Sequence, residues 1–246
     1  MRHSLFLLAA AQLIAFVTPA QTIPVRPFHR VIISPYIQAT FVEGDQESVT
    51  INNSIVDSAK LHVEVRGGTL RIYLEGAKDF PRNRQGYDDY GRKHSYNLYP
   101  NHAVVATITY RDLDALSLRG EETFLCQSPL SARDFTLRVY GDGKVIFTET
   151  HFSEMHATLY GDASVDIRSG DVNQQYYTSY GDGHINATAI AGQTAKLTAF
   201  GEAEFRINVS DWIRITSFGE AKLRYMGNPE ILKGLHFGGV DVQRLD

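Results

Sequence analysis

The stretch RVYGDGKVIF (residues 138–147) carries a motif that recurs along the second half of the chain. An aromatic residue, a glycine, an acid and a small residue appear again in TLYGDASVDI, TSYGDGHINA, TAFGEAEFRI and TSFGEAKLRY. A sequence repeat of this length is typical of solenoid proteins, in which each unit packs mainly on its two neighbours. The glycines that anchor successive units lie 18 to 21 residues apart, and they are Gly120, Gly141, Gly161, Gly181, Gly201, Gly219 and Gly238.

The alternation of side chains around each glycine indicates strands. Positions at even offsets from the glycine are mostly apolar or small, such as Leu137 and Val145, whereas odd offsets after it are mostly polar, such as Lys144. A period of two places the apolar set on one face of a strand. Units of this length suit a coil of short strands and tight bends, stacked about 4.8 Å apart. The expected fold is all-β, a right-handed parallel β-helix of about 20-residue rungs.

The first hundred residues follow a different pattern. Several alternating segments read as strands, and RGGT (residues 66–69) reads as a hairpin turn. We expect these strands to flank and cap the solenoid, because solenoids need protected ends. Between them, residues 78–101 contain Pro, Gly and several tyrosines, which predicts a long exposed loop. The predicted organisation is N-terminal strands over residues 21–105 and a β-helix repeat region over residues 106–246.

The N-terminus predicts export. A short polar start is followed by an apolar run over residues 5–17, which is too short to span a bilayer comfortably. Small residues then favour cleavage after Ala20, so residues 1–20 are predicted to be a signal peptide. The expected location is the periplasm, the outer-membrane surface or the extracellular space. No later apolar run is long enough for a transmembrane span.

Composition and motifs argue against several classes of protein. The net charge is −4 without a basic stripe, so nucleic acid is not an expected partner. The single cysteine, Cys126, lies in an alternating run and is expected to be a buried structural thiol. No nucleophile elbow, phosphate loop or zinc motif is present. We therefore expect a protein that is not an enzyme and that carries no cofactor and no metal.

A family resemblance adds to this interpretation. It is carried by the opening FHRVIISPYIQATFVEGDQESVTI, the segment LHVEVRGGTLRIYLEG, the glycine-centred rungs and the final YMGNPEI. Together they resemble the head domain of autotransporter adhesins, the GIN domain family of exported bacterial proteins. The resemblance covers roughly residues 27–245 and implies a β-helical fold and an adhesive role, with no catalytic residues to carry over. The family's usual repeat is Gly-Ser-Gly-Asp, whereas this chain has an acid at the serine position.

Two columns of side chains are the candidate ligand surface. The aromatic column consists of the residues just before the glycines, namely Tyr140, Tyr160, Tyr180, Phe200, Phe218 and Phe237. The acid column consists of the residues just after them, namely Asp142, Asp162, Asp182, Glu202 and Glu220. Both columns point outward if the strand does not bulge at the glycine, whereas a bulge turns the aromatic residues inward. A linear row of carboxylates does not supply the closed cage of oxygens that calcium takes.

An outward-facing pair of columns predicts carbohydrate binding, because aromatic faces stack on sugar rings and carboxylates accept hydrogen bonds from hydroxyl groups. The predicted ligand-binding residues are Tyr140, Asp142, Tyr160, Asp162, Tyr180, Asp182, Phe200 and Glu202. The expected function is a non-enzymatic adhesion or carbohydrate-binding module of the cell envelope, with a glycan or another cell-surface polymer as partner.

Two alternatives remain open. In the first, the protein is a structural or assembly module that forms a homo-oligomer through its aromatic column. In the second, it is a polysaccharide-active enzyme, because two acids on adjacent rungs lie at roughly the separation that glycoside hydrolysis uses. Against the enzyme, every rung offers the same pair of acids and nothing in the sequence distinguishes one of them.

Overall fold

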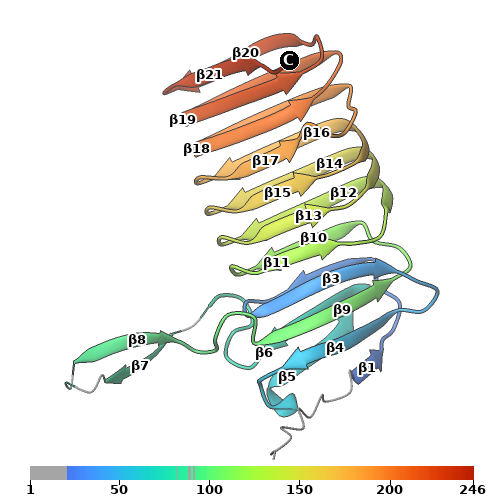
Figure 1. Ribbon diagram of the computed structural model, residues 1–246, viewed down its shortest axis with the longest axis vertical. Coiled ribbons are helices and arrows are strands. Elements are labelled where there is room, and N and C mark those ends of the chain that lie inside the picture. The colour runs from blue at the N-terminus through green and yellow to red at the C-terminus, as the bar shows by residue number, and fades with distance from the viewer. Residues whose placement is uncertain (1–20, 82, 88–89, 91) are drawn as a thin grey trace, which may run out of the picture.

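The computed structural model describes residues 21–81, 83–87, 90 and 92–246, and this part of the chain is almost entirely β (Figure 1). Nineteen strands form one continuous sheet and two more form a separate hairpin. The single helical element among the described residues is a 3-10 turn, Ser58–Lys60. None of the helical structure in these residues is long and apolar enough to cross a membrane. The expected parallel β-solenoid is confirmed.

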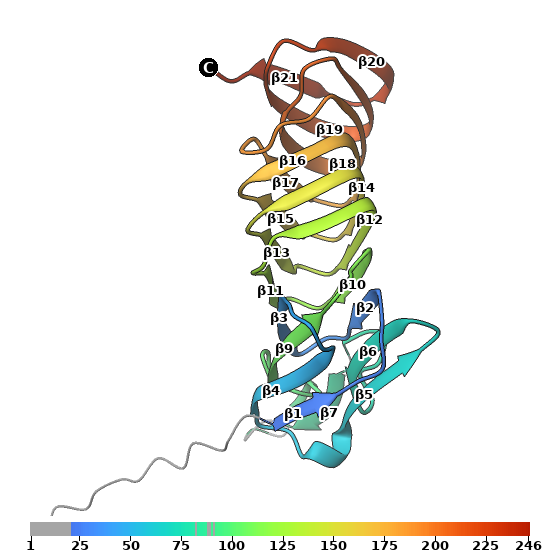
Figure 2. The same cartoon turned by 90° about the vertical axis from the view of Figure 1, so that its right-hand side faces the viewer.

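The solenoid is a stack of rungs, each with one strand before the glycine corner and one after it (Figures 1 and 2). In the last complete rungs one long strand runs through the corner and supplies both sides. The strands of the repeat region are β10 (Ala115–Arg119), β11 (Thr123–Cys126), β12 (Leu130–Tyr140), β13 (Lys144–Phe147), β14 (Thr150–Tyr160), β15 (Ser164–Ile167), β16 (Gly170–Tyr180), β17 (His184–Ala187), β18 (Thr194–Asn208), β19 (Trp212–Met226), β20 (Glu230–Phe237) and β21 (Val240–Arg244).

Successive rungs pair in parallel and in register, so equivalent residues of the repeat lie directly above one another. Tyr140 pairs with Tyr160, and glycine pairs with glycine where Gly201 lies below Gly219. This register follows from the near-constant repeat length, because one turn of the coil consumes one repeat. Side chains at equivalent positions of successive rungs therefore form columns along the stack, one strand spacing apart.

The even-offset residues fill the interior, as the alternation predicts. Leu137, Val139, Val145 and Phe147 are fully buried in one rung, and the same positions of the other rungs continue this core along the axis. Because each rung packs its side chains on the rungs above and below, the core is one continuous column.

Glycine is required at the corners because of the backbone conformation there and the close approach of the neighbouring rung. Gly181 has a φ of 120°, in the region that disfavours residues with a side chain. A Cβ atom placed on Gly181 would lie 2.8 Å from the carbonyl oxygen of Gly161 in the rung below. The small residue two positions later, such as Ala163 or Gly183, is buried at the same tight corner.

The N-terminal strands both extend the solenoid and close its lower end. β2 lies in parallel below β10 and β3 lies below β11, so these two strands complete a further rung. β6 and β9 pair in parallel below them, and the antiparallel strands β5, β4 and β1 finish the stack. Their bounds are β1 (Gln21–Pro24), β2 (Arg30–Ile33), β3 (Ile37–Glu43), β4 (Ser48–Ser54), β5 (Leu61–Arg66), β6 (Thr69–Leu74) and β9 (Val104–Tyr110).

The segment expected to be an exposed loop, residues 78–101, contains a hairpin. β7 (Asn83–Tyr87) pairs antiparallel with β8 (Lys93–Asn97) and forms the separate two-stranded sheet. Figure 1 shows this hairpin projecting sideways from the lower part of the solenoid. Its strands are polar and do not alternate with apolar residues, which is why their sequence gives no strand signal.

Candidate functional site

The aromatic column lies on the outer surface of the solenoid. Val139 and Gly143 are buried on the inner side of their rung, so Tyr140 between them faces outward without a bulge. The upper rings are the most exposed: Tyr180, Phe200 and Phe218 retain 36–41% of their accessible surface, and Phe237 retains 63%. The alternative in which a bulge turns these rings inward is therefore wrong.

The rings of the aromatic column stack face to face along the solenoid axis. Consecutive ring centroids lie 4.7 to 5.7 Å apart, and the ring planes differ by 3 to 20°. At the lower end, the guanidinium group of Arg119 lies 5.5 Å from the centroid of Tyr140 and continues the stack as a cation–π contact. The inner rings therefore cover each other's faces and present their edges to solvent, and Phe237 is the last ring of the column.

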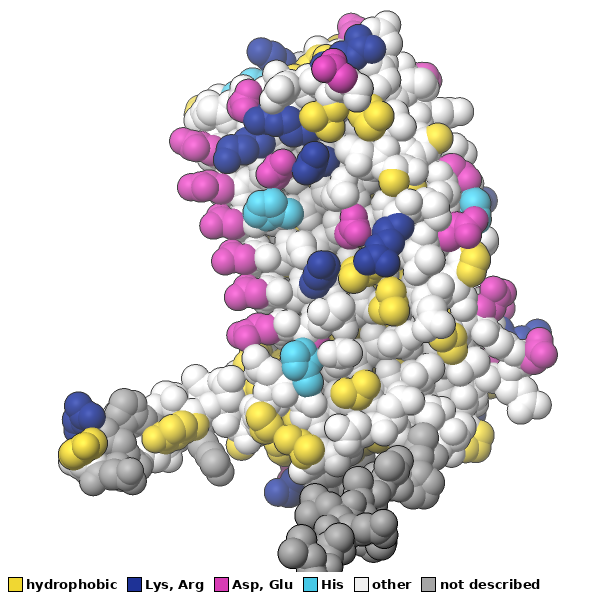
Figure 3. Space-filling view, viewed as in Figure 1, with side chains coloured by type: hydrophobic (Ala, Val, Ile, Leu, Met, Phe, Trp, Pro, Cys, Tyr) yellow, Lys and Arg dark blue, Asp and Glu magenta, His cyan; other side chains and the backbone are white. Residues whose placement is uncertain are grey.

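The acid column runs beside the aromatic column. All five of its carboxylates are exposed, and Figure 3 shows Asp and Glu side chains in a row along one edge of the molecule. None of them forms an ion pair within the described part of the chain. The backbone N–H of Asp162 donates to the carboxylate of Asp142 at 3.4 Å, which is a weak compensation for the repulsion between neighbouring charges.

Glu121 extends the acid column by one rung at its lower end, and the sequence interpretation missed it. It follows Gly120 as Asp142 follows Gly141, and its side chain is exposed. It accepts a hydrogen bond of 3.2 Å from Asn101. The signal that could have found it is the glycine spacing alone, because the residue before this glycine is Arg119 and the aromatic part of the motif is missing.

A third column of hydroxyl groups lies on the other side of the aromatic column. Its members are half-buried and pair in register from rung to rung, and they are Thr158, Thr178, Thr198 and Thr216. Across the outer face of four rungs, the order is therefore hydroxyl group, ring edge and carboxylate. The eight predicted ligand-binding residues lie together on this face, within four adjacent rungs.

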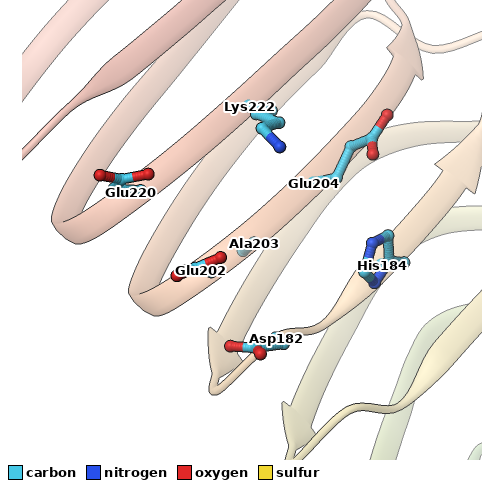
Figure 4. A pocket seen from close by; sticks show the side chains of 7 residues that line it. All are labelled: Asp182, His184, Glu202, Ala203, Glu204, Glu220 and Lys222. Carbon is cyan, nitrogen blue, oxygen red and sulfur yellow. The ribbon is translucent and has the colours of Figure 1, made fainter.

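A small pocket opens beside the upper half of the acid column (Figure 4). Figure 4 shows two rows of side chains, with the acid column at the bend and a second row two residues further along each strand. The pocket has a volume of about 150 Å³, and its lining combines carboxylates, an imidazole and an ammonium group. The lining residues are Asp182, Glu202, Glu220, His184, Glu204, Lys222 and Ala203.

A buried thiol and a buried carboxyl group lie apart from this surface. Cys126 is fully buried, and burial raises the pKa of its thiol, as expected for a structural cysteine. Glu122 retains 1% of its accessible surface, and burial raises the pKa of its carboxyl group. It stands where the next rung has Gly143 and points inward. Within the described residues, no group of three or more His, Cys, Asp or Glu side chains is arranged to hold a metal ion.

Comparisons with known proteins agree with this architecture. Three solved structures have the same fold at 14–18% sequence identity. A "putative adhesin" from Bacteroides fragilis has a TM-score of 0.72 at 16% identity, covering 91% of this chain and 96% of that one. A "putative lipid binding protein" from Parabacteroides distasonis has a TM-score of 0.67 at 18% identity, covering 92% and 96%. A "putative adhesin" from Parabacteroides merdae has a TM-score of 0.64 at 14% identity, covering 92% and 95%.

Comparison with curated proteins gives no match. A family model, in contrast, matches residues 27–229, which is most of the chain. Its description is "Putative auto-transporter adhesin, head GIN domain". The chain belongs to this family of adhesin head domains.

Proposed function

We propose that this protein is an exported, non-enzymatic adhesion module of the cell envelope. It binds an extended, uncharged glycan along the outer face that carries the hydroxyl, aromatic and acid columns. The observation that carries the proposal is the set of three outward-facing columns in register, with half-buried hydroxyl groups, ring edges and exposed carboxylates repeated on successive rungs. The adhesive role itself is supported by the family to which the chain belongs.

The chemistry of the columns suits a sugar polymer that lies along the solenoid axis. Carboxylates accept strong hydrogen bonds from sugar hydroxyl groups, and threonine hydroxyls both donate and accept. The ring edges between them provide an apolar strip for the C–H surface of the sugar. Because the stacked faces are covered, the ligand contacts edges along most of the column, and face stacking is left to Phe237 at its end.

The repeat distance also favours a polymer. The ring centroids are mostly 4.7 to 5.0 Å apart, which is similar to the length of one pyranose residue in an extended chain. A glycan can therefore meet equivalent groups on each rung. The unpaired carboxylates repel polyanions, so uronate-rich or phosphorylated polymers are disfavoured as ligands.

The same charges argue against an oligomer in which two acid columns meet, and against the enzyme. Direct contact between the corners of two copies would bring two acid columns together, and like charges 4 Å apart repel by about 1 kcal/mol per pair even in water. A glycosidase needs one acid and one base or nucleophile with different roles, whereas the acid column offers an exposed carboxylate at the same position of every rung, and nothing distinguishes one pair of rungs.

The experiment is a glycan array probed with the mature protein, residues 21–246, followed by measurement of affinity for any glycan retained. We expect the double variant Asp162→Asn with Asp182→Asn to bind at least about tenfold more weakly, because a tenfold change corresponds to 1.4 kcal/mol and hydrogen bonds to charged groups contribute about that much or more. Asp45→Asn with Asp112→Asn is the matched control, because both acids are exposed and lie away from the columns.

Equal binding by the column variant and the control would place the ligand elsewhere. Absence of any retained neutral glycan, with the protein folded, would refute carbohydrate binding. Hydrolysis or cleavage of a bound polysaccharide would favour the enzyme instead.

A further inference from the structure

The hairpin β7–β8, called here the arm, has no supporting layer of its own. Within the described residues its two strands pair only with each other, from Asn83 opposite Asn97 to Tyr87 opposite Lys93. Figure 1 shows it extending away from the solenoid instead of lying on it. An isolated two-stranded hairpin is at best marginally stable in water, because it buries little apolar surface. A partner that covers the arm would supply that burial.

The root of the arm, in contrast, is firmly attached. The carboxylate of Asp79 accepts hydrogen bonds from Arg71 at 2.5 Å and from Arg119 at 2.7 Å, and these bonds lower its pKa. On the returning side, the hydroxyl of Tyr99 donates to the carbonyl oxygen of Glu75 at 2.9 Å. The direction in which the arm leaves the body is therefore fixed at its base, beside the lower end of the aromatic column.

The arm is basic and aromatic, whereas the rest of the chain is acidic. The arm, residues 83–97, contains three Arg or Lys and two Asp, a net charge of +1, and the whole chain carries −4, which leaves −5 for the remainder. Tyr90 is 84% exposed, and the guanidinium of Arg92 lies 5.3 Å from the centroid of its ring. Lys93 and Tyr96 are also exposed.

The complementary surface is the aromatic column with the acid column beside it. Its upper rings are exposed, and its neighbouring carboxylates have no ion-pair partner in the described part of the chain. Figure 3, drawn in the same view as Figure 1, shows the arm and the row of acids on the same side of the molecule. The arm runs outward from its own column, so a second copy placed alongside is the partner it can reach.

We propose that the arm of one copy docks on the aromatic and acid columns of a second copy. Arg92 and Lys93 pair with carboxylates of the acid column, and the rings of Tyr90 and Tyr96 pack against the exposed rings of the aromatic column. This contact brings unlike charges together, whereas direct contact between the acid columns of two copies brings like charges together. The proposal does not depend on glycan binding, although a bound glycan and a docked arm would compete for the same columns.

The test is sedimentation of the purified mature protein, residues 21–246, over a range of concentrations at low and high salt and without glycan. We expect association that increases with concentration and weakens at high salt, because the pairs are near the surface and are screened. An arm variant, Arg92→Glu with Lys93→Glu, and a column variant, Asp162→Lys with Asp182→Lys, should each remain monomeric.

An equimolar mixture of the two variants should associate again, because the reversed arm meets the reversed column and the unchanged arm meets the unchanged column. Asp45→Lys with Asp112→Lys is the matched control and should associate like the wild type. A wild type that is monomeric at every concentration in low salt overturns the proposal. So does unchanged association of either variant, or a mixture of monomeric variants that stays monomeric.

Discussion

Substituting one corner glycine tests whether the rung geometry is as described. Gly181→Ala adds a methyl group to a residue with a φ of 120°, and this methyl lies 2.8 Å from the carbonyl oxygen of Gly161. The backbone conformation alone costs an L-residue about 1–2 kcal/mol. Overpacking of a tight site adds about 1–3 kcal/mol. We expect a loss of about 3 kcal/mol in the free energy of unfolding.

The matched control is Gly143→Ala, two positions after a corner glycine. The φ of Gly143 is not in the left-handed region, and its added Cβ would lie 3.2 Å from the carbonyl oxygen of Gly120. Alanine already occupies the equivalent position at Ala163, Ala203 and Ala221. The neighbours of Gly143 therefore need to shift by only a few tenths of an ångström, and we expect a change of no more than about 1 kcal/mol.

The assay is urea unfolding followed by circular dichroism, with the slope m examined as well as the midpoint. Because each rung contacts mainly its neighbours, Gly181→Ala can also separate the upper rungs from the lower ones and broaden the transition. Equal losses for the two variants, or a loss below about 1 kcal/mol for Gly181→Ala, would refute the role assigned to the corner.

Three further predictions concern pH and export. Burial raises the pKa of Glu122 above its unfolded value, so the contribution of this carboxyl group to stability is lost as the pH rises through the folded pKa. In urea unfolding, Glu122→Gln should therefore be more stable than the wild type at pH 7, and its gain in the free energy of unfolding should be smaller at pH 4. Hydrogen bonds to Asp171 and Glu149 raise the pKa of His151, so its stabilisation is present below pH 6.5 and is lost at higher pH. His151→Gln should therefore remove less than about 1 kcal/mol at pH 6 and almost nothing at pH 9, because the pair is exposed. N-terminal sequencing of the exported protein should begin at Gln21, and a sequence that begins at Met1 would contradict removal of the signal peptide.

The rungs could be predicted from the sequence because their spacing is a direct consequence of the fold. In a parallel coil each turn consumes one repeat, so the glycine spacing reports the rung length and the register. The sequence alone leaves open on which side of the strand the aromatic column lies, because one extra residue at Gly141 reverses it. The buried Val139 and Gly143 on either side of Tyr140 resolve that ambiguity.

Other features depend on contacts that the repeat pattern does not contain. The N-terminal strands β2 and β3 complete a rung below β10 and β11, although the paired residues are 85 positions apart in sequence. The hairpin in residues 78–101 has no apolar alternation, so its strands are defined by backbone pairing alone. The covering of ring faces within the aromatic column follows from the register, yet the sequence interpretation treated these faces as available to sugar.

The columns are not uniform along the stack, and this gives the surface a direction. The lower rungs combine tyrosine with aspartate, as in Tyr160 and Asp162, whereas the upper rungs combine phenylalanine with glutamate, as in Phe200 and Glu202. Both changes occur at the same step between rungs, so the phenolic hydroxyl groups end where the longer acids begin, while the threonine hydroxyls continue. A polymer that binds along the axis thus meets a more polar half and a more apolar half. Because the two halves differ, reversing the polymer exchanges its contacts, and the surface can distinguish the two directions of a chain whose ends are chemically different.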